Sequence, residues 1–200
     1  MPVQFCLALL GLFTLTAASD PDCEDLVKTE VDPTKICGKW IFHAGTSDNE
    51  IARNALRAIH SSWLDIAPIP GSNEMTMRYG DKIDGKCFQG AVNFIFSTNL
   101  TKVTFSFNAS THDHIGRHLV TCPDCLLWTD QSVSEENGQT KERRNLYLFT
   151  KSGTLDASHQ DKFKKQAKCL NFPEELHFGT NTDLCPDEKE ADTDATKKEQ

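Results

Sequence analysis

The sequence has fewer positive than negative side chains, and it has no long hydrophobic run beyond its first residues. Its 21 lysine and arginine residues face 29 aspartate and glutamate residues, so the net charge is −8. A chain of this sign repels phosphate backbones and anionic lipid surfaces, so nucleic acid is not an expected partner. Internal repeats are also lacking, and 200 residues with 25% charged side chains are typical of one globular domain.

Catalytic signatures are absent as well. The chain contains no Gly-x-Ser-x-Gly, no His-Glu-x-x-His and no glycine-rich phosphate loop. His112, His114 and His118 are close in sequence, but the intervening Asp113 and Gly116 favour a loop, and no further ligand for a metal ion can be named. We therefore predict neither an enzyme, nor a cofactor, nor a metal site.

The first nineteen residues have the composition of a secretion signal. They carry no charged side chain, and an apolar stretch over residues 5–15 leads to small residues that end at Ser19. This stretch is too short to span a bilayer comfortably. Residues 1–19 are thus predicted to be a signal peptide, and the mature protein is predicted to be secreted without membrane insertion.

Two further features agree with secretion. Removing Cys6 with the signal leaves seven cysteines, which is normal outside the cell and unusual in a reducing cytosol. Asn99 and Asn108 begin Asn-x-Ser/Thr sequences and are predicted glycosylation sites. At the other end, residues 186–200 hold six acidic and three basic residues and nothing apolar larger than alanine, so we predict a disordered charged tail after a folded domain at 20–185.

The middle of the chain alternates apolar and polar residues with the period of β-strands. Three rows each put large side chains on one face: Met75, Met77 and Tyr79; Val92, Phe94 and Phe96; Val103, Phe105 and Phe107. Residues 126–129 and 146–149 indicate two more strands that are apolar on both faces, so their facing stays open. Short strands joined by turns favour an antiparallel barrel or sandwich.

Only two segments have helical spacing. Ser47 and Glu50 have the spacing of a capping box, and apolar residues follow at helical intervals to Ile59. That helix is either an entrance flap or an ordinary helix packed outside the sheet. Phe163 lies on the apolar face of the second helix, which Pro173 ends. A strand-rich body with one C-terminal helix favours an all-β, eight-stranded up-and-down antiparallel barrel with that helix packed outside.

Short motifs in this chain resemble those of the lipocalin family. The triplet Gly38-Lys39-Trp40 is similar to the family's Gly-x-Trp motif, and Thr129-Asp130 after a late strand is similar to its Thr-Asp motif. Lys151 stands at the approximate place of the family's arginine. The resemblance implies structural roles for Gly38, Trp40, Thr129 and Asp130, with Trp40 closing the base of a lipocalin barrel.

The cysteine positions resemble one branch of that family, which holds orosomucoid and apolipoprotein M. By this resemblance Cys23 pairs with Cys169, and Cys87 pairs with Cys185. Cys122 and Cys125 are predicted to form a local disulfide, because a thioredoxin-like role needs a parallel βαβ setting and a structural zinc needs two more ligands. Cys37 is the odd thiol: it is buried and inert, bonded to another chain, bonded to one member of the Cys-x-x-Cys pair, or a ligand for an organotin.

Two segments point further within this branch. Residues 37–45 and 122–128 are most similar to fish plasma proteins that bind saxitoxin and tetrodotoxin, and to their tributyltin-binding relatives. The resemblance covers essentially residues 20–190, and it implies a lipocalin domain that carries a small molecule in plasma. Which ligand belongs to this chain stays open.

The strand rows also indicate how a ligand would be bound. A face rich in large apolar groups suits a ligand cavity, although the same rows could fill a solid core. Asp81 shares the parity of Tyr79, so its carboxylate stands either in the cup, where it would pair with a cationic ligand, or in a turn after Gly80. The predicted ligand-binding residues are Met75, Met77, Tyr79, Asp81, Phe94, Phe96, Phe105, Phe107 and Trp128.

Together these features predict a secreted plasma carrier of a small hydrophobic, or cationic and amphiphilic, compound of the saxitoxin, tetrodotoxin or tributyltin type. A monomer is the favoured state. The first alternative is an apolipoprotein M-like lipid carrier, which would need arginine or lysine inside the cup, whereas the inward-facing set shows none. The second alternative is a lipocalin enzyme that acts through the thiol of Cys37.

Overall fold

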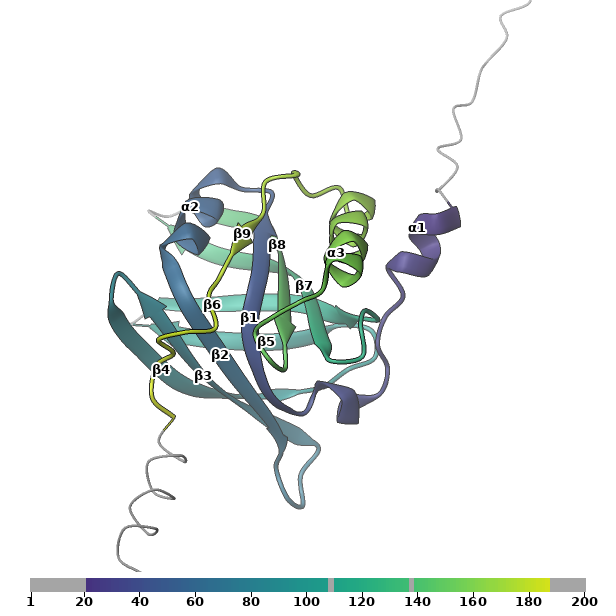
Figure 1. The fold of residues 1–200 in the computed structure, drawn as a ribbon. Coiled ribbons are helices and arrows are strands. Elements are labelled where there is room, and N and C mark those ends of the chain that lie inside the picture. Colours follow the sequence, from purple (N-terminus) through teal and green to yellow (C-terminus); the bar gives the residue numbers. More distant parts are fainter. Residues whose placement is uncertain (1–20, 108–109, 137–138, 188–200) are drawn as a thin grey trace, which may run out of the picture.

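Eight antiparallel strands form the body of the protein (Figure 1). The computed structural model describes residues 21–107, 110–136 and 139–187. The strands lie side by side in the order β4-β3-β2-β1-β8-β7-β6-β5, so each one pairs with its neighbour in the chain and β1 pairs with β8. Their bounds are β1 Gly38–Ser47, β2 Ile59–Pro68, β3 Glu74–Ile83, β4 Lys86–Ile95, β5 Thr101–Phe107, β6 Ser110–Leu119, β7 Cys125–Glu136 and β8 Gln139–Thr150.

The barrel is nearly closed. The end strands β4 and β5 are joined by the short link of residues 96–100 and lie against each other, although no ladder between them is formed within the described residues. A ninth strand, β9 His177–Phe178, pairs with β1 outside this path. The predicted all-β, eight-stranded up-and-down barrel is therefore confirmed.

Helix α3, Ala157–Cys169, packs on the outside of the barrel, as predicted (Figure 1). Its Phe163, which is fully buried, meets Leu127, Leu146 and Leu148 of β7 and β8. Burying one such side chain contributes about 1.5–3 kcal/mol. This contact settles the facing of both strands: the leucines point outward under α3, whereas Phe149 lines the interior.

Three shorter helices complete the fold. They are α1 Pro21–Leu26, the 3-10 turn η1 Pro33–Ile36 and α2 Glu50–Ala58. The cap of α2 differs from the prediction, because the side chain of Asn49, and not that of Ser47, accepts from the Ala52 N–H. Ser47 still belongs to β1, where its hydroxyl donates to the carbonyl of Arg144, so the capping role passes two residues along the chain.

Trp40 lies near the start of β1 beside η1, at the end of the barrel that is called the base here. Its ring is 2% exposed, and its indole N–H donates to the Ile36 carbonyl at 2.9 Å. The ammonium of Lys151 lies 3.5 Å from the centre of the Trp40 ring and donates to the Cys37 carbonyl at 3.1 Å. A lysine therefore supplies the cation that stacks on this tryptophan. Gly38 has a φ of 99°, a conformation that favours glycine.

Three disulfides join the cysteine pairs named from the sequence. Cys23–Cys169 ties α1 to α3, Cys87–Cys185 ties β4 to the C-terminal segment, and Cys122–Cys125 spans the turn before β7. Of the cysteines in the described ranges, Cys37 alone is free. Its half-buried thiol donates to the carbonyl of Pro33, which lies in η1 at the base of the barrel.

The C-terminal segment follows the outside of the barrel further than predicted. Asp187 was placed in the disordered tail, but its carboxylate is buried and accepts from Arg78 of β3 at 2.7 Å, with Lys39 at 3.4 Å. The indole N–H of Trp63 donates to the Cys185 carbonyl in the same region. These contacts hold the segment because two cations face one carboxylate. The predicted signal peptide and residues 188–200 lie outside the described residues.

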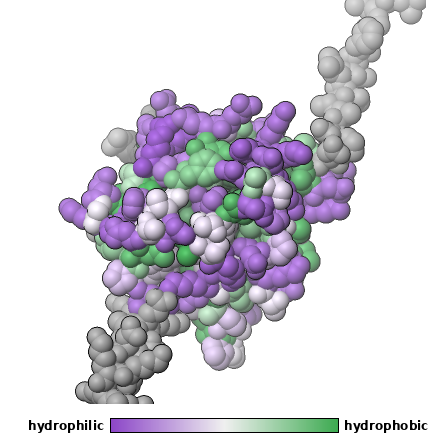
Figure 2. All heavy atoms as spheres, viewed as in Figure 1, coloured by the Kyte–Doolittle hydropathy of each residue, from purple (hydrophilic) through white to green (hydrophobic). Residues whose placement is uncertain are grey.

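The surface in Figure 2 is mostly hydrophilic, with apolar side chains in small groups between charged ones. In the described part of the chain, no helix combines the length and the apolar character needed to cross a bilayer.

Candidate functional site

The interior of the barrel holds a cavity of about 400 Å³. This volume lies in the range of small-molecule sites, which is about 300–1,000 Å³. Helix α2 contributes Ala52, Ala55 and Leu56 to the cavity wall. Of the two alternatives for this helix, the structure therefore supports a cover over the cavity. The strand rows enclose a hollow and do not fill the whole barrel.

Six of the nine predicted ligand-binding residues line the cavity. They are Met77, Tyr79, Asp81, Phe94, Phe105 and Trp128. The rings of Tyr79 and Phe105 meet edge to face with their centres 5.7 Å apart, and they form part of an aromatic wall. Phe42 and Phe149, which the sequence did not single out, add to this wall.

Met75 and Phe96 are not among the residues that line the cavity. Met75 is 5% exposed and packs in the same core cluster as Trp40, towards the closed end. Phe96 stacks on His118 with ring centres 6.0 Å apart. The alternation of a strand gives the face of a side chain but not its depth in the barrel. Phe107 is the last residue of β5, and its side chain lies outside the described part of the chain. Of the two predicted glycosylation sites, Asn99 is exposed between β4 and β5, and Asn108 lies outside the described residues.

Asp81 lies in the cavity wall and not in a turn. Strand β3 continues past it to Ile83, and the turn follows at Asp84 and Gly85, whose φ angles are 48° and 76°. Burial raises the pKa of Asp81, and a hydrogen bond from the Ser62 hydroxyl offsets part of that shift. Across the described ranges no lysine, arginine or histidine forms an ion pair with Asp81. A buried carboxylate without a counter-charge favours a cationic partner.

The segment with three histidines is a strand, so the predicted loop is wrong. His112, His114 and His118 lie on β6 and all line the cavity. Gly116 does not mark a turn; a Cβ there would collide with the carbonyl of Thr129 on the neighbouring strand, so glycine allows the two backbones to approach. The described residues contain no group of three or more histidine, cysteine or acidic side chains that could hold a metal ion.

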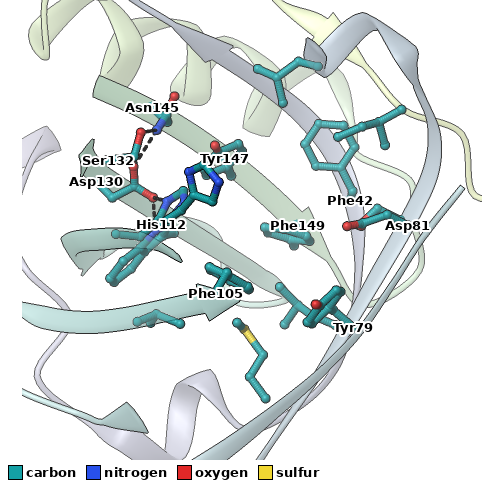
Figure 3. Close-up of a pocket in the computed structure, with 18 of the residues that line it drawn as sticks. Phe42, Tyr79, Asp81, Phe105, His112, Asp130, Ser132, Asn145, Tyr147 and Phe149 are labelled. Atoms are coloured by element: carbon teal, nitrogen blue, oxygen red, sulfur yellow. Dashed lines mark hydrogen bonds and ion pairs between the residues drawn. The ribbon is translucent and has the colours of Figure 1, made fainter. Parts of the chain in front are cut away.

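Asp130 is the centre of a polar wall in the cavity (Figure 3). Its Oδ2 accepts from the indole N–H of Trp128 at 2.7 Å and lies 2.9 Å from Nδ1 of His114. Its Oδ1 accepts from Nδ2 of Asn145 at 2.7 Å, and the same Nδ2 lies 3.1 Å from the Ser132 hydroxyl. The network is buried, since Asp130 is 5% and Asn145 is 2% exposed.

Thr129 and Asp130 lie in the middle of β7 and do not follow a strand. Thr129 donates to the Asn145 carbonyl at 3.1 Å, while Asp130 holds the network described above and also faces the cavity. The parity shared by Trp128, Asp130 and Ser132 could have indicated this facing, once the facing of Trp128 was known. The structural role that the resemblance implies for both residues stays a prediction.

Strand β8 brings two further residues that the sequence analysis missed. Arg143 and Tyr147 line the cavity on the same strand as Asn145 and Phe149. The prediction that no arginine or lysine faces the interior is thus wrong, because the facing of β8 could not be assigned. The pKa of Tyr147 is raised well above its usual value by burial, and the negative charges of Asp130 and Asp81 add to this effect while Arg143 opposes it.

His118 is a buried neutral histidine. It is 7% exposed and packs between Phe96 and Trp128, whose ring centre lies 4.6 Å away. Its Nδ1 is buried and has no hydrogen-bond partner among the residues that the structure describes. Burial lowers the pKa of His118 from 6.5 to about 3. This side chain fills space at the cavity wall and resists protonation.

The fold was compared with those of known proteins. No family model and no curated protein matches the sequence. Among solved structures, an odorant-binding protein called OBP1 matches with a TM-score of 0.59 and 18% identity, over 79% of this chain and 99% of that one. The chain has the lipocalin fold.

Two other lipocalin structures support this assignment. A dog lipocalin allergen matches with a TM-score of 0.56 and 21% identity, over 76% of this chain and 98% of the allergen. The siderocalin Ex-FABP, described as having dual ligand specificities, matches with a TM-score of 0.56 and 15% identity, over 76% of this chain and 95% of that one. At such identities the comparison establishes the lipocalin barrel and leaves the choice of ligand to the residues of this cavity.

Proposed function

We propose that this protein is a secreted carrier that holds a small molecule with an apolar body and a cationic group in its barrel. The observation that carries the proposal is Asp81, a carboxylate in the cavity wall that has no counter-charge in the described chain. A ligand cation beside it would supply the missing charge. The aromatic neighbours Tyr79 and Phe105 would hold the apolar body.

The energetics are sufficient for useful affinity. Burying about 300 Å² of apolar ligand surface is worth about 7 kcal/mol before ordering costs are deducted. A cation near the face of Tyr79 adds roughly 0.5–2 kcal/mol. The apolar wall therefore supplies most of the affinity in this proposal, and Asp81 supplies the preference for a positive charge.

The extracellular setting is part of the same proposal. Three disulfides in one chain favour an oxidising compartment. Asn99 is exposed in the link between β4 and β5, so a glycan attached to it would point into solvent. Asn108 is proposed as a second glycosylation site. Blood plasma is the proposed fluid and a monomer the proposed state. The tributyltin cation has both features of the proposed ligand class, whereas saxitoxin and tetrodotoxin share with it only the positive charge, which is carried by guanidinium groups.

Arg143 favours a second candidate, the apolipoprotein M-like lipid carrier. It lines the cavity on the same strand as Tyr147, and an anionic head group would bind there. The two candidates differ in the sign of the ligand charge. An enzyme acting through Cys37 is not proposed, because this thiol does not line the cavity and donates to Pro33 at the base.

Three tricyclic probes of similar size separate these candidates: 9-aminoacridine is cationic at neutral pH, 1-aminoanthracene is neutral, and 9-anthracenecarboxylate is anionic. Titration of the full chain, followed by probe fluorescence, should give the tightest binding for 9-aminoacridine. Asp81→Asn should weaken 9-aminoacridine about tenfold or more and leave 1-aminoanthracene unchanged. Tightest binding of 9-anthracenecarboxylate would support the lipid carrier, and equal effects of D81N on all three probes would refute the ion pair.

A further inference from the structure

The hydrogen bonds of Asp130 fix the tautomer of His114. The indole N–H of Trp128 can only donate, and Nδ2 of Asn145 donates to the other carboxylate oxygen. The remaining contact joins Oδ2 of Asp130 to Nδ1 of His114 at 2.9 Å. A carboxylate only accepts, so Nδ1 carries the hydrogen. In the neutral ring, Nε2 is then a bare acceptor.

This acceptor is available to a ligand. The His114 side chain keeps 21% of its surface exposed although β6 turns it inward, and it lines the cavity. Its ring meets the Phe105 ring edge to face, with centres 5.2 Å apart. Within the described chain, no hydrogen bond to Nε2 is formed. The atom therefore combines a fixed lone pair with an aromatic neighbour at the cavity wall.

The cavity thus has two separate acceptors. Figure 3 shows Asp130, which orients His114, on one side of the view and Asp81 on the other, with Phe105 and Phe149 between them. A ligand that satisfies both acceptors carries a cation at one end and an O–H or N–H donor at the other, with an apolar body between. A ligand with only one polar end would leave one of the two acceptors without a hydrogen bond at a partly buried position, and this weakens binding.

The geometry points to His114 Nε2 as a ligand-binding atom that accepts a hydrogen bond from a hydroxyl or N–H group of the ligand. The ligand class is an amine or guanidine whose far end carries a second hydrogen-bond donor. Asp130 is the positioning residue, and Trp128 and Asn145 hold it in place. This inference rests on the proposed carrier function and makes its ligand more specific.

Nitrogen NMR of the ¹⁵N-labelled full chain tests the tautomer directly. The His114 resonances are identified by their loss in His114→Gln. We expect Nδ1 to be the protonated nitrogen and Nε2 to be the bare one in the neutral ring. A hydrogen on Nε2 would overturn the inference. The tautomer is read from the wild-type chain without any ligand, and His114→Gln serves only to identify the resonances.

A matched ligand series tests the binding role. The probes are 4-(ω-aminoalkyl)phenols with side chains of different lengths and their methyl ethers, which lack only the O–H donor. At the best chain length, the wild-type chain should bind the phenol about five- to tenfold more tightly than the ether, the usual net worth of one hydrogen bond. His114→Phe should remove this preference, whereas the control His60→Gln, at an exposed surface position, should keep it.

The outcomes separate this inference from the carrier proposal. Equal binding of phenols and ethers to the wild type overturns the role of His114, and the carrier proposal stands if 9-aminoacridine still depends on Asp81. If neither the phenols nor their methyl ethers bind, the ligand class inferred here is wrong. A preference for phenols that persists in His114→Phe assigns the donor contact to another residue and contradicts the proposal.

Discussion

Replacing His118 with phenylalanine should make the protein less sensitive to acid. Burial holds the pKa of His118 at about 3 in the folded chain, whereas the unfolded chain has the ordinary value of 6.5. Between these values the unfolded chain binds the proton and the folded chain does not, so the free energy of unfolding falls as the pH falls. Above about pH 6.5 both states are neutral and the penalty vanishes.

The magnitude follows from the two pKa values. One pKa unit corresponds to about 1.4 kcal/mol, so His118 costs about 2 kcal/mol of stability at pH 5 and about 4 kcal/mol at pH 3. For a domain of this size, about 2 kcal/mol corresponds to a Tm change of roughly 4–8 °C. Phenylalanine keeps a flat ring between Phe96 and Trp128 and removes the buried Nδ1 that lacks a partner.

The assay is thermal unfolding, followed by circular dichroism at pH 7.5 and pH 5, of the wild type and His118→Phe. Comparing the loss of Tm between the two pH values in each protein removes the contribution of all other titrating groups. We expect the wild type to lose roughly 4–8 °C more than the variant. His60→Gln, a change at an exposed histidine, should behave as the wild type does. Equal losses in the wild type and His118→Phe would refute the buried neutral state of His118.

Three further predictions concern the core and the cavity. Asp81→Asn should raise the Tm at pH 7 and leave it unchanged at pH 3. Because burial raises the pKa of Asp81, the folded chain binds this proton more tightly than the unfolded chain does, and the charged carboxylate destabilises the fold as the pH rises. An unchanged Tm at pH 7 would contradict the burial of the charge. Phe163→Ala should lower the free energy of unfolding in urea by about 3–5 kcal/mol, because the ring under α3 is fully buried; a loss below about 1 kcal/mol would mean that α3 does not pack as described. Tyr79→Ala or Phe105→Ala should weaken 9-aminoacridine several-fold with an unchanged circular dichroism spectrum, and unchanged affinity in both would show that these rings do not contact the probe.

Side-chain facing could be predicted from the sequence for strands with one polar and one apolar face. It could not be predicted for strands whose two faces are both apolar. In β3 the outer face carries polar side chains such as Arg78 and the inner face carries apolar ones, so alternation placed Met77 and Tyr79 on the inner face, whereas the position of Asp81 stayed open. In β8, helix α3 covers the outer face, so both faces carry apolar side chains and their periodicity does not show which face points inward. Arg143 in the cavity was missed for this reason.

Other errors came from residues whose role depends on a neighbouring strand. Gly116 was taken as a loop signal, but it serves a close approach to Thr129 that no single-strand pattern contains. The position of Asp130 in the cavity wall was missed, because its partners His114 and Asn145 come from the strands on either side of it. Asp187 was placed in a solvated tail because its cations, Arg78 and Lys39, lie more than a hundred residues away in the chain.

A crystal structure of the protein with 9-aminoacridine would show whether the barrel is hollow and whether Asp81 meets the ligand cation. We expect the probe inside the cavity, its rings against Tyr79 and Phe105, and a protonated nitrogen about 2.7–2.9 Å from a carboxylate oxygen of Asp81. If side chains fill the cavity, or if the probe binds with its nitrogen away from Asp81, the protein does not bind cations in the way proposed here.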